Sequence, residues 1–440
     1  MITLNRYART AGWLSVLSMG LGQLYNRQWT KGVLFLLAHI TGITLITTVL
    51  SNHIAGFFTL GEQGQHLVKV GKIYKNIPGD HSIFMMIYGL LSMMVVLLYV
   101  FIYVMNVRDA VANGRLREQG LPTKTFIDSI RHGVHNNFPW LILAIPILGV
   151  LFFTIMPILF MIFMAFTNYS APEHLPPKNL VDWVGLQTFR DLFTLNVWSD
   201  TFFGVLTWTI IWAILATVTC YFGGILVALL INQQGIKLKG LWRTLFIIPY
   251  AIPQFVSLLV MRNMLNDKFG PINQYFRYLG LDGLPWLSDP FWAKVSVIVV
   301  NMWIGIPVTM VLVMGILTSI PKDLYEAAEV DGATPWIKFR NITMPFVLFS
   351  TAPILITQFA GNINNFNVIF LLTKGGPSSI DYNMAGKTDL LVTWLYKLTL
   401  ENNKYNVASA VGILIFLIIA SVSIFSYTRT RSYREEDMIQ

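Results

Sequence analysis

The sequence predicts an all-α protein that crosses a membrane about eight times. Of its 440 residues, 55% are hydrophobic, 14% are aromatic and only 12% are charged, and the mean hydropathy is +0.59. Eight apolar windows are each about 20 residues long, the length that a helix needs to cross a hydrocarbon layer of roughly 30 Å. Because no water reaches that layer, each crossing segment must satisfy its own backbone hydrogen bonds, which favours helices.

The eight expected spans follow one another along the whole chain. Their approximate limits are 32–51, 83–106, 140–166, 202–231, 243–265, 291–318, 346–372 and 406–427. With both termini in the cytoplasm, the segments on that side carry 18 Lys and Arg residues, against 11 on the opposite side. Short cytoplasmic loops are enriched in these residues, so the sequence predicts a multi-pass membrane protein with cytoplasmic termini.

The net charge of +9 arises mainly from Lys and Arg beside the spans. This is the usual pattern of membrane topology, so we expect no nucleic-acid partner. The basic linker 107–139, with Arg108, Arg115, Arg117 and Arg131, is expected to contact anionic lipid headgroups.

A polar stretch, residues 320–345, lies between the sixth and seventh spans on the predicted cytoplasmic side. Pro321 suits the first turn of a helix, and Asp323 and Glu326 complement its positive start. Gly332 can adopt the left-handed conformation that ends such a helix. We therefore expect a short amphipathic helix that ends at Gly332.

A second short helix is expected after that glycine. Trp336, Phe339 and Ile342 recur at three-residue spacing, which predicts an aromatic face that packs back under the bundle. Pro345 is expected to stop this second helix.

The residues of this stretch resemble the EAA loop of ABC-importer permeases. The match includes Glu326-Ala327-Ala328, Asp331-Gly332-Ala333, Phe339, Ile342 and Pro345. The resemblance implies the permease fold of type I ABC importers and a loop that docks on a separate cytoplasmic ATPase. The implied coupling residues are Glu326, Ala327, Ala328, Asp331 and Gly332. The alternative is an amphipathic loop lying at the membrane interface.

Five further motifs narrow the resemblance to carbohydrate permeases of the maltose/maltodextrin type. They are Pro249-Tyr250-Ala251-Ile252-Pro253, Phe269-Gly270-Pro271-Ile272-Asn273, Trp303-Ile304-Gly305-Ile306-Pro307, Asn364-Asn365-Phe366 and Leu372-Thr373-Lys374-Gly375-Gly376-Pro377. The resemblance covers residues 140–440, which we expect to form a permease core with six spans. Residues 1–139 are then a front region with two spans and the basic linker.

Amide side chains interrupt the apolar seventh span. Gln358, Asn362 and Asn365 are expected on one helical face, and amides both donate and accept hydrogen bonds, as sugar hydroxyls require. The resemblance implies sugar contacts for Tyr250, Gln254, Ile304, Gly305, Val308, Gln358, Gly361, Asn362 and Asn365. Gln254 and Gln358 replace serines of the family member compared, and Val308 and Gly361 replace aromatic residues. The alternative is that these amides bond neighbouring helices.

We expect no catalytic residues, metal ligands or bound cofactor in this chain. It has no Gly-rich Lys-Ser/Thr loop to cradle phosphates, so ATP-Mg should be bound and hydrolysed by partner subunits. The resemblance implies a second permease, two ATPases and an external sugar-binding protein that delivers an oligosaccharide. Two rivals are an ion-coupled secondary transporter, which usually needs acids within its spans, and a membrane enzyme acting on lipid-linked sugars. An importer for a different oligosaccharide is a third alternative.

Overall fold

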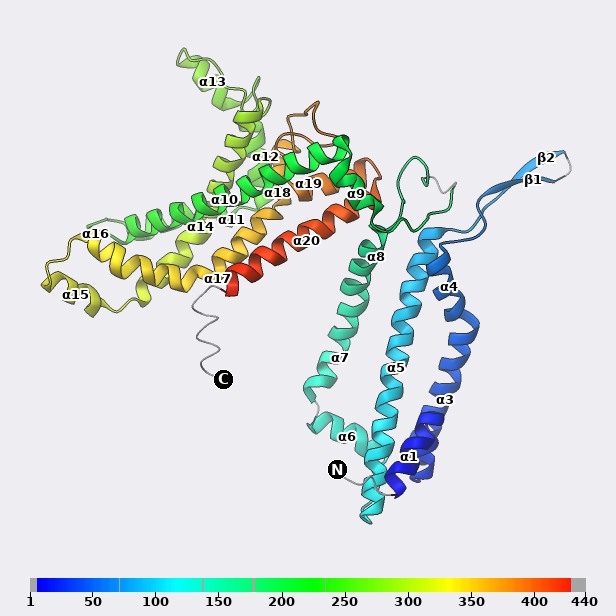
Figure 1. Cartoon of the computed structure of the whole chain (residues 1–440). Helices are drawn as coiled ribbons and strands as arrows, with labels where there is room; N and C mark the ends of the chain where they lie inside the picture. Colours follow the sequence, from blue (N-terminus) through cyan, green and yellow to red (C-terminus); the bar gives the residue numbers. More distant parts are fainter. Residues whose placement is uncertain (1–5, 71, 137, 176–178, 234, 429–440) are drawn as a thin grey trace. The chain divides into compact units, whose positions relative to one another are not determined.

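The computed structural model is mainly helical, with one short two-stranded sheet among the described residues, which confirms the predicted fold class (Figure 1). It describes the chain except for residues 1–5, 71, 137, 176–178, 234 and 429–440. The chain divides into two compact units, Met1–Val184 and Gly185–Gln440, each described below by itself. The sequence predicted a domain boundary at residue 139, and this boundary stays a prediction. The first compact unit extends beyond it and includes the helix that begins at residue 138.

The first unit contains three long helical segments and a short hairpin. Its elements are α1 Arg6–Leu17, α2 Leu21–Tyr25, α3 Trp29–Leu45, a π-helical turn Ile46–Leu50, α4 Ser51–Thr59, β1 His66–Val70, β2 Ile73–Ile77, α5 Ser82–Glu118, α6 Phe126–Asn136, α7 Phe138–Val150, a π-helical turn Leu151–Ile155 and α8 Met156–Met164. The strands pair antiparallel, with His66 opposite Ile77. The helix α1 packs along α5, and α4 packs on α5 further along.

A helical hairpin precedes the first span, in a segment whose structure the sequence left open. Gly20 joins α1 to α2 with a φ of +93°, a conformation that glycine adopts without strain. A side chain at Gly22 would place its Cβ 2.2 Å from the carbonyl oxygen of Ala11, so only glycine lets the two helices approach this closely.

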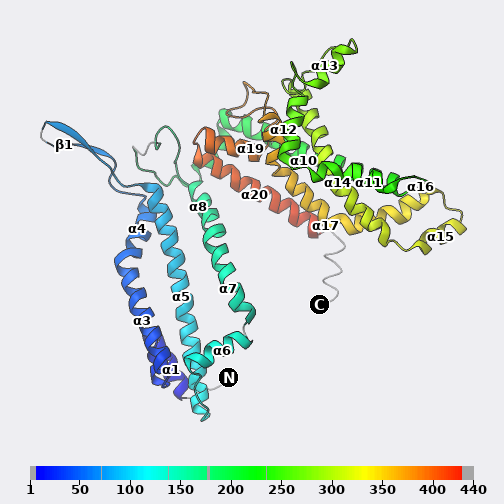
Figure 2. The ribbon, with the colours of Figure 1, turned by 180° about the vertical axis from the view of Figure 1, so that it is seen from behind.

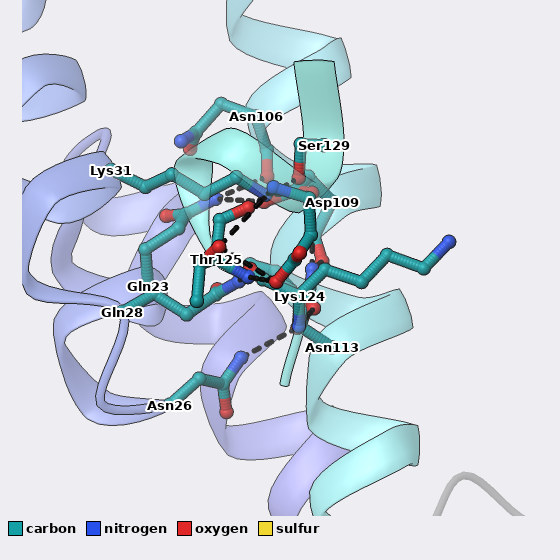
Figure 3. Close-up of polar contacts among 12 residues, drawn as sticks. Gln23, Asn26, Gln28, Lys31, Asn106, Asp109, Asn113, Lys124, Thr125 and Ser129 are labelled. Atoms are coloured by element: carbon teal, nitrogen blue, oxygen red, sulfur yellow. Dashed lines mark hydrogen bonds and ion pairs between the residues drawn. The ribbon is translucent and has the colours of Figure 1, made fainter. Parts of the chain in front are cut away.

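Polar side chains hold this hairpin against α5 (Figure 3). We call Gln23, Asn26, Gln28, Lys31, Asn106, Asp109 and Asn113 the front polar cluster. The Lys31 Nζ lies 2.8 Å from Asp109 Oδ1, and Asn113 Nδ2 donates to the same oxygen at 3.0 Å. Asn26 Nδ2 donates to the carbonyl oxygen of Ala110 at 2.9 Å. The cluster therefore joins the start of the first span to the end of the second.

The second unit is a bundle around two long helices. Its elements are α9 Gln187–Thr194, α10 Asn196–Asn232, α11 Lys239–Ala251, α12 Gln254–Met264, α13 Pro271–Tyr278, α14 Pro290–Ser319, α15 Lys322–Val330, α16 Pro335–Lys338, a π-helical turn Phe339–Thr343, α17 Met344–Ile363, α18 Phe366–Thr373, α19 Leu391–Tyr396, a π-helical turn Lys397–Glu401 and α20 Tyr405–Thr428. Within this unit, α15 and α16 lie at one end and α9 and α19 at the other (Figures 1 and 2).

The helices α10 and α14 form the centre of this bundle. Trp212 and Met310 are fully buried between neighbouring helices. A Cβ at Gly224 would lie 2.5 Å from the Cβ of Thr309, so this glycine permits close contact between the two long helices. Small residues at such contacts are typical of membrane helix pairs, in which the backbones approach closely.

The eight expected spans are present as helices of suitable length and apolarity. Seven are long and apolar enough without a bend of more than 40°, although the seventh along the chain is interrupted at Asn364 and Asn365. The remaining span is the pair α11 and α12, which is bent by 91°. The bend falls at Ile252 and Pro253, and Pro253 cannot donate a backbone hydrogen bond. Pro307 lies within α14 without interrupting it.

The prediction that Pro345 ends a separate short helix is wrong. The segments α16 and α17 join through the π-helical turn, so one helical path leads from Pro335 into the seventh span. Pro345 lies in the first turn of α17. A wider helical turn directly ahead of it accommodates a residue that has no backbone N–H to donate.

Candidate transport path and coupling loop

The polar stretch after α14 forms the helix that the sequence predicted. The helix α15 begins after Pro321 and ends before Gly332, whose φ is +75°. The Ala333 N–H donates to the carbonyl oxygen of Ala328 at 2.8 Å, and the Gly332 N–H donates to that of Glu329 at 3.0 Å. These bonds complete the helix end, and the expected left-handed glycine is confirmed.

Two contacts brace α15 against the helix that follows. Lys338 Nζ lies 2.6 Å from Glu329 Oε1, and the hydroxyl groups of Tyr325 and Thr343 are 2.9 Å apart. Phe339 packs against a buried cluster that includes Met310 and Val347. Trp336 is 65% exposed, so only part of the expected aromatic face packs under the bundle.

The expected coupling residues lie on the free surface of this braced loop. Glu326, Ala327, Asp331 and Gly332 are exposed, and Ala328 is half-buried. Within the described residues, the Glu326 carboxylate has no hydrogen-bond or ion-pair partner. The loop therefore exposes an acid and an alanine pair on a helix that is held by contacts to the following helix. A partner protein can contact these residues at this end of the second unit.

Two groups of bonded amide side chains lie near the break in the seventh span, Asn365 with Asn301 and Asn362, and Asn367 with Gln254. We call Gln254, Asn301, Asn362, Asn365 and Asn367 the amide cluster. Asn365 Nδ2 lies 3.4 Å from Asn301 Oδ1 and 3.5 Å from Asn362 Oδ1. Asn367 Nδ2 donates to Gln254 Oε1 at 3.2 Å. These bonds are long for their type, and no ionised side chain takes part in them.

The predicted single helical face for Gln358, Asn362 and Asn365 is wrong. The helix α17 ends at Ile363, and Asn365 caps α18, where its Oδ1 accepts from the Val368 N–H at 3.3 Å. Asn362 is 8% exposed, and its Nδ2 donates to Thr217 Oγ1 at 3.0 Å. Asn362 and Asn365 still meet, because the chain turns between them.

The other expected sugar contacts are scattered over three helices. Tyr250 and Val308 are 68% and 48% exposed, Gly361 is exposed and Gln358 is half-buried. Ile304 packs on an apolar cluster, and a Cβ at Gly305 would lie 2.5 Å from Cys220 Sγ. The structure therefore brings Asn362 and Asn365 into contact. Gln254 bonds Asn367, and Gly305 lies at the contact between α14 and α10.

Three partners of these amides were missed by reasoning from the sequence. Thr217, Asn301 and Asn367 each bond a predicted residue. Their only signal in the sequence is a polar side chain in an apolar span, a feature that many membrane helices share.

The loop between α18 and α19 is built around a buried carboxylate. Asp389 is 1% exposed, and its Oδ2 lies 2.6 Å from Lys397 Nζ and accepts from the Gly386 N–H at 2.7 Å. Burial raises the pKa of Asp389, while Lys397 opposes that shift. A side chain at Gly375 would collide with this carboxylate, so the Gly-Gly-Pro motif fits closely around it.

Comparisons with known proteins identify the family of this chain. Residues 220–431 match the family model described as the binding-protein-dependent transport system inner membrane component. The galactooligosaccharides transport system permease protein GanP of Bacillus subtilis (strain 168) is 38% identical over 95% of this chain and 96% of its own length. The maltodextrin transport system permease protein MdxF of the same organism is 38% identical over 99% of both chains.

A solved structure shows the same fold at lower identity. It is the crystal structure of a bacterial alginate ABC transporter in complex with an alginate pentasaccharide-bound periplasmic protein. One of its chains has a TM-score of 0.57 and 23% identity, covering 69% of this chain and 97% of that one. The chain therefore belongs to the binding-protein-dependent ABC importer permeases, the membrane-embedded components of these transport systems.

Proposed function

We propose that this permease carries neutral oligosaccharides into the cytoplasm, as one half of a transmembrane pair powered by separate ATPase subunits. The proposed substrate class rests on the similarity of this chain, over nearly its whole length, to permeases named for galactooligosaccharides and for maltodextrin. The two names share a chemistry, a chain of hydroxyl-rich hexose units. The proposal names this class of sugar and no particular linkage or length.

The amide cluster supports a polar path for such a substrate. Its bonds of 3.2–3.5 Å join neutral donors and acceptors that sugar hydroxyls can replace one for one. Breaks in the fifth and seventh spans lie beside these side chains, at Ile252–Pro253 and at Asn364–Asn365. Irregular backbone in a membrane is tolerated where it lines a cavity or is buried in protein, which suits a substrate path.

The α15 loop supports the coupling part of the proposal. Its exposed Glu326 suits an ion pair with a basic side chain of a cytoplasmic ATPase. The bonds of Lys338 and Tyr325 link α15 to the helix that leads into the seventh span, so a movement of α15 is transmitted to that span. ATP-Mg is then bound and hydrolysed by two such subunits, with both termini of this chain on their side of the membrane. A second permease and an external sugar-binding protein complete the importer.

Uptake by cells that produce this chain with its partner subunits tests the proposal. Labelled maltotriose and a β-linked galactotriose are offered separately, to wild type and to a complex whose ATPase cannot hydrolyse ATP. We expect uptake of at least one sugar by wild type and none by the ATPase-dead complex. Failure to take up either sugar would overturn the proposed substrate class, and uptake without ATP hydrolysis would overturn the coupling.

The loop has its own test within the same system. Glu326→Lys should abolish most uptake while the protein still reaches the membrane, because it puts a positive charge where a basic partner is expected. Asp323→Lys, on the same helix but outside the expected contact residues, is the matched control and should retain most uptake. Equal uptake by both variants would remove Glu326 from the coupling contact.

A further inference from the structure

We propose that a second polar cavity, at the far end of α12 and α18 from the amide cluster, binds the trailing units of the same oligosaccharide. This proposal rests on the proposed function and names an additional part of the sugar path. The cavity measures about 690 Å³ and is lined chiefly by the end of α12 and the loop that follows it. Its principal polar lining residues are Arg262, Asn263, Asn266, Asp267, Lys268 and Ser288.

The cavity contains polar groups that the fold does not use. Arg262 is half-buried, and neither its guanidinium nor the exposed Asn263 amide has a hydrogen-bond partner in the described part of the chain. By contrast, Asn266 Oδ1 accepts from the Phe269 N–H at 2.9 Å, and Asp267 Oδ1 accepts from the Leu287 N–H at 3.2 Å. The loop is thus held by two of its polar side chains, while two others are available to a ligand.

The composition of the cavity suits a neutral sugar. Arg262 and Asn263 supply donors, Asp267 and Asn263 supply acceptors, and both kinds are needed to bind hydroxyl groups. Phe269 is 78% exposed at the cavity wall and offers an aromatic surface to the apolar face of a sugar ring.

The same two helices connect the cavity to the amide cluster. Near their starts, α12 and α18 are joined by the bond between Asn367 and Gln254. Near their ends, Leu259 and Arg262 of α12 and Leu372 of α18 line one cavity. From Gln254 to Asn263 the helix rises by about 14 Å, at about 1.5 Å per residue. A chain of several sugar units can span that distance, so a longer oligosaccharide reaches further toward Arg262 than a disaccharide at the amide cluster.

Dependence on sugar length tests this inference. Transport by the complete importer is measured with di-, tri- and pentasaccharides of whichever series the wild type imports. Arg262→Gln should lower the transport rate at limiting pentasaccharide by about tenfold, the effect of losing a hydrogen bond to a charged group. It should change disaccharide transport less than twofold. Asn263→Ala should act in the same direction by about threefold.

The matched control is Lys374→Gln. Lys374 is also cationic, it is exposed and it follows α18 directly, but it does not line this cavity. We expect its transport of both sugars to stay within twofold of wild type.

Two results would overturn the inference while leaving the proposed function intact. Equal losses for disaccharide and pentasaccharide in Arg262→Gln would assign the cavity to docking of the sugar-binding protein. Unchanged transport of every sugar would show that no ligand uses Arg262. Failure of wild type to import any oligosaccharide would instead overturn the proposed function, and this inference with it.

Discussion

Each of the two compact units contains a cluster of polar side chains, and the clusters differ in charge and in bond length. The front polar cluster contains the Lys31–Asp109 ion pair, with 2.8 Å between its atoms. The amide cluster has only neutral side chains, joined by bonds of 3.2–3.5 Å. A buried charge that loses its partner is strongly destabilising, whereas a neutral amide loses about 1 kcal/mol per bond and readily accepts a new partner.

This difference separates a structural cluster from a candidate binding cluster. In the front cluster, the side chains of Gln23 and Asn26 bond backbone carbonyl groups of α5, which fixes one helix against another. In the amide cluster, Asn365 and Asn367 donate to amide side chains of other segments rather than to backbone carbonyl groups. A polar side chain inside a membrane protein therefore does not by itself indicate a binding site. The groups to which it is hydrogen-bonded must also be known.

The largest expected effect is on stability, in the front polar cluster. Asp109→Leu leaves Lys31, which is 5% exposed, without its counter-charge. Because Asp109 itself is 29% exposed, we expect a loss near the lower end of the range for such changes, about 3 kcal/mol. Thermal unfolding of the purified protein in detergent measures this loss.

Lys69→Met is the control for that experiment. Lys69 is an exposed residue of β1, and its replacement should leave the unfolding temperature nearly unchanged. Equal stability of Asp109→Leu and wild type would contradict a structural role for the ion pair, and with it the contrast between the clusters.

A smaller effect is expected on transport, in the amide cluster. Asn365→Ala should raise the sugar concentration for half-maximal transport about tenfold, which corresponds to about 1.4 kcal/mol. Its stability should fall by about 1 kcal/mol, because Asn365 also caps α18 by accepting from the Val368 N–H. The neighbouring Asn364 is exposed, and no bond involves its side chain among the described residues, so Asn364→Ala is the matched control. If the two variants transport sugar alike, Asn365 does not contact it.

The smallest effect is expected at Asn106, a member of the front polar cluster. Its side chain is fully buried, and neither amide atom has a hydrogen-bond partner within the part of the chain that the structure describes. Gln23 bonds only its backbone carbonyl, which a substitution retains. Asn106→Leu should therefore be neutral or stabilise the fold by about 1 kcal/mol, as measured by thermal unfolding. A loss comparable to that of Asp109→Leu would mean that the cluster needs this amide.

The spans and the α15 helix were predictable because both depend on local sequence. Apolar length sets the spans, and Pro321 and Gly332 set the start and end of α15. The break at Asn364 and Asn365 was not predictable, because the apolar pattern continues on both sides of it. The continuation of the helix through Pro345 was missed for a similar reason: a π-helical turn has no clear signature in the sequence.

The candidate site was predictable only in part. Asn362 and Asn365 were expected from the resemblance and do meet. The partners Thr217, Asn301 and Asn367 of the expected amides depend on contacts between distant segments. The front polar cluster joins residues about 80 positions apart in the same way. One sequence alone carries no signal for such pairs.

A structure of the assembled importer, trapped during transport with a bound pentasaccharide, tests most directly whether the amide cluster binds sugar. We predict sugar hydroxyls within hydrogen-bonding distance of Asn365 and Gln254, with the bond from Asn367 to Gln254 broken. The ion pair between Lys31 and Asp109 should remain intact. A sugar chain bound elsewhere, with all the amide bonds still in place, would contradict this assignment and make the amide cluster a second structural cluster.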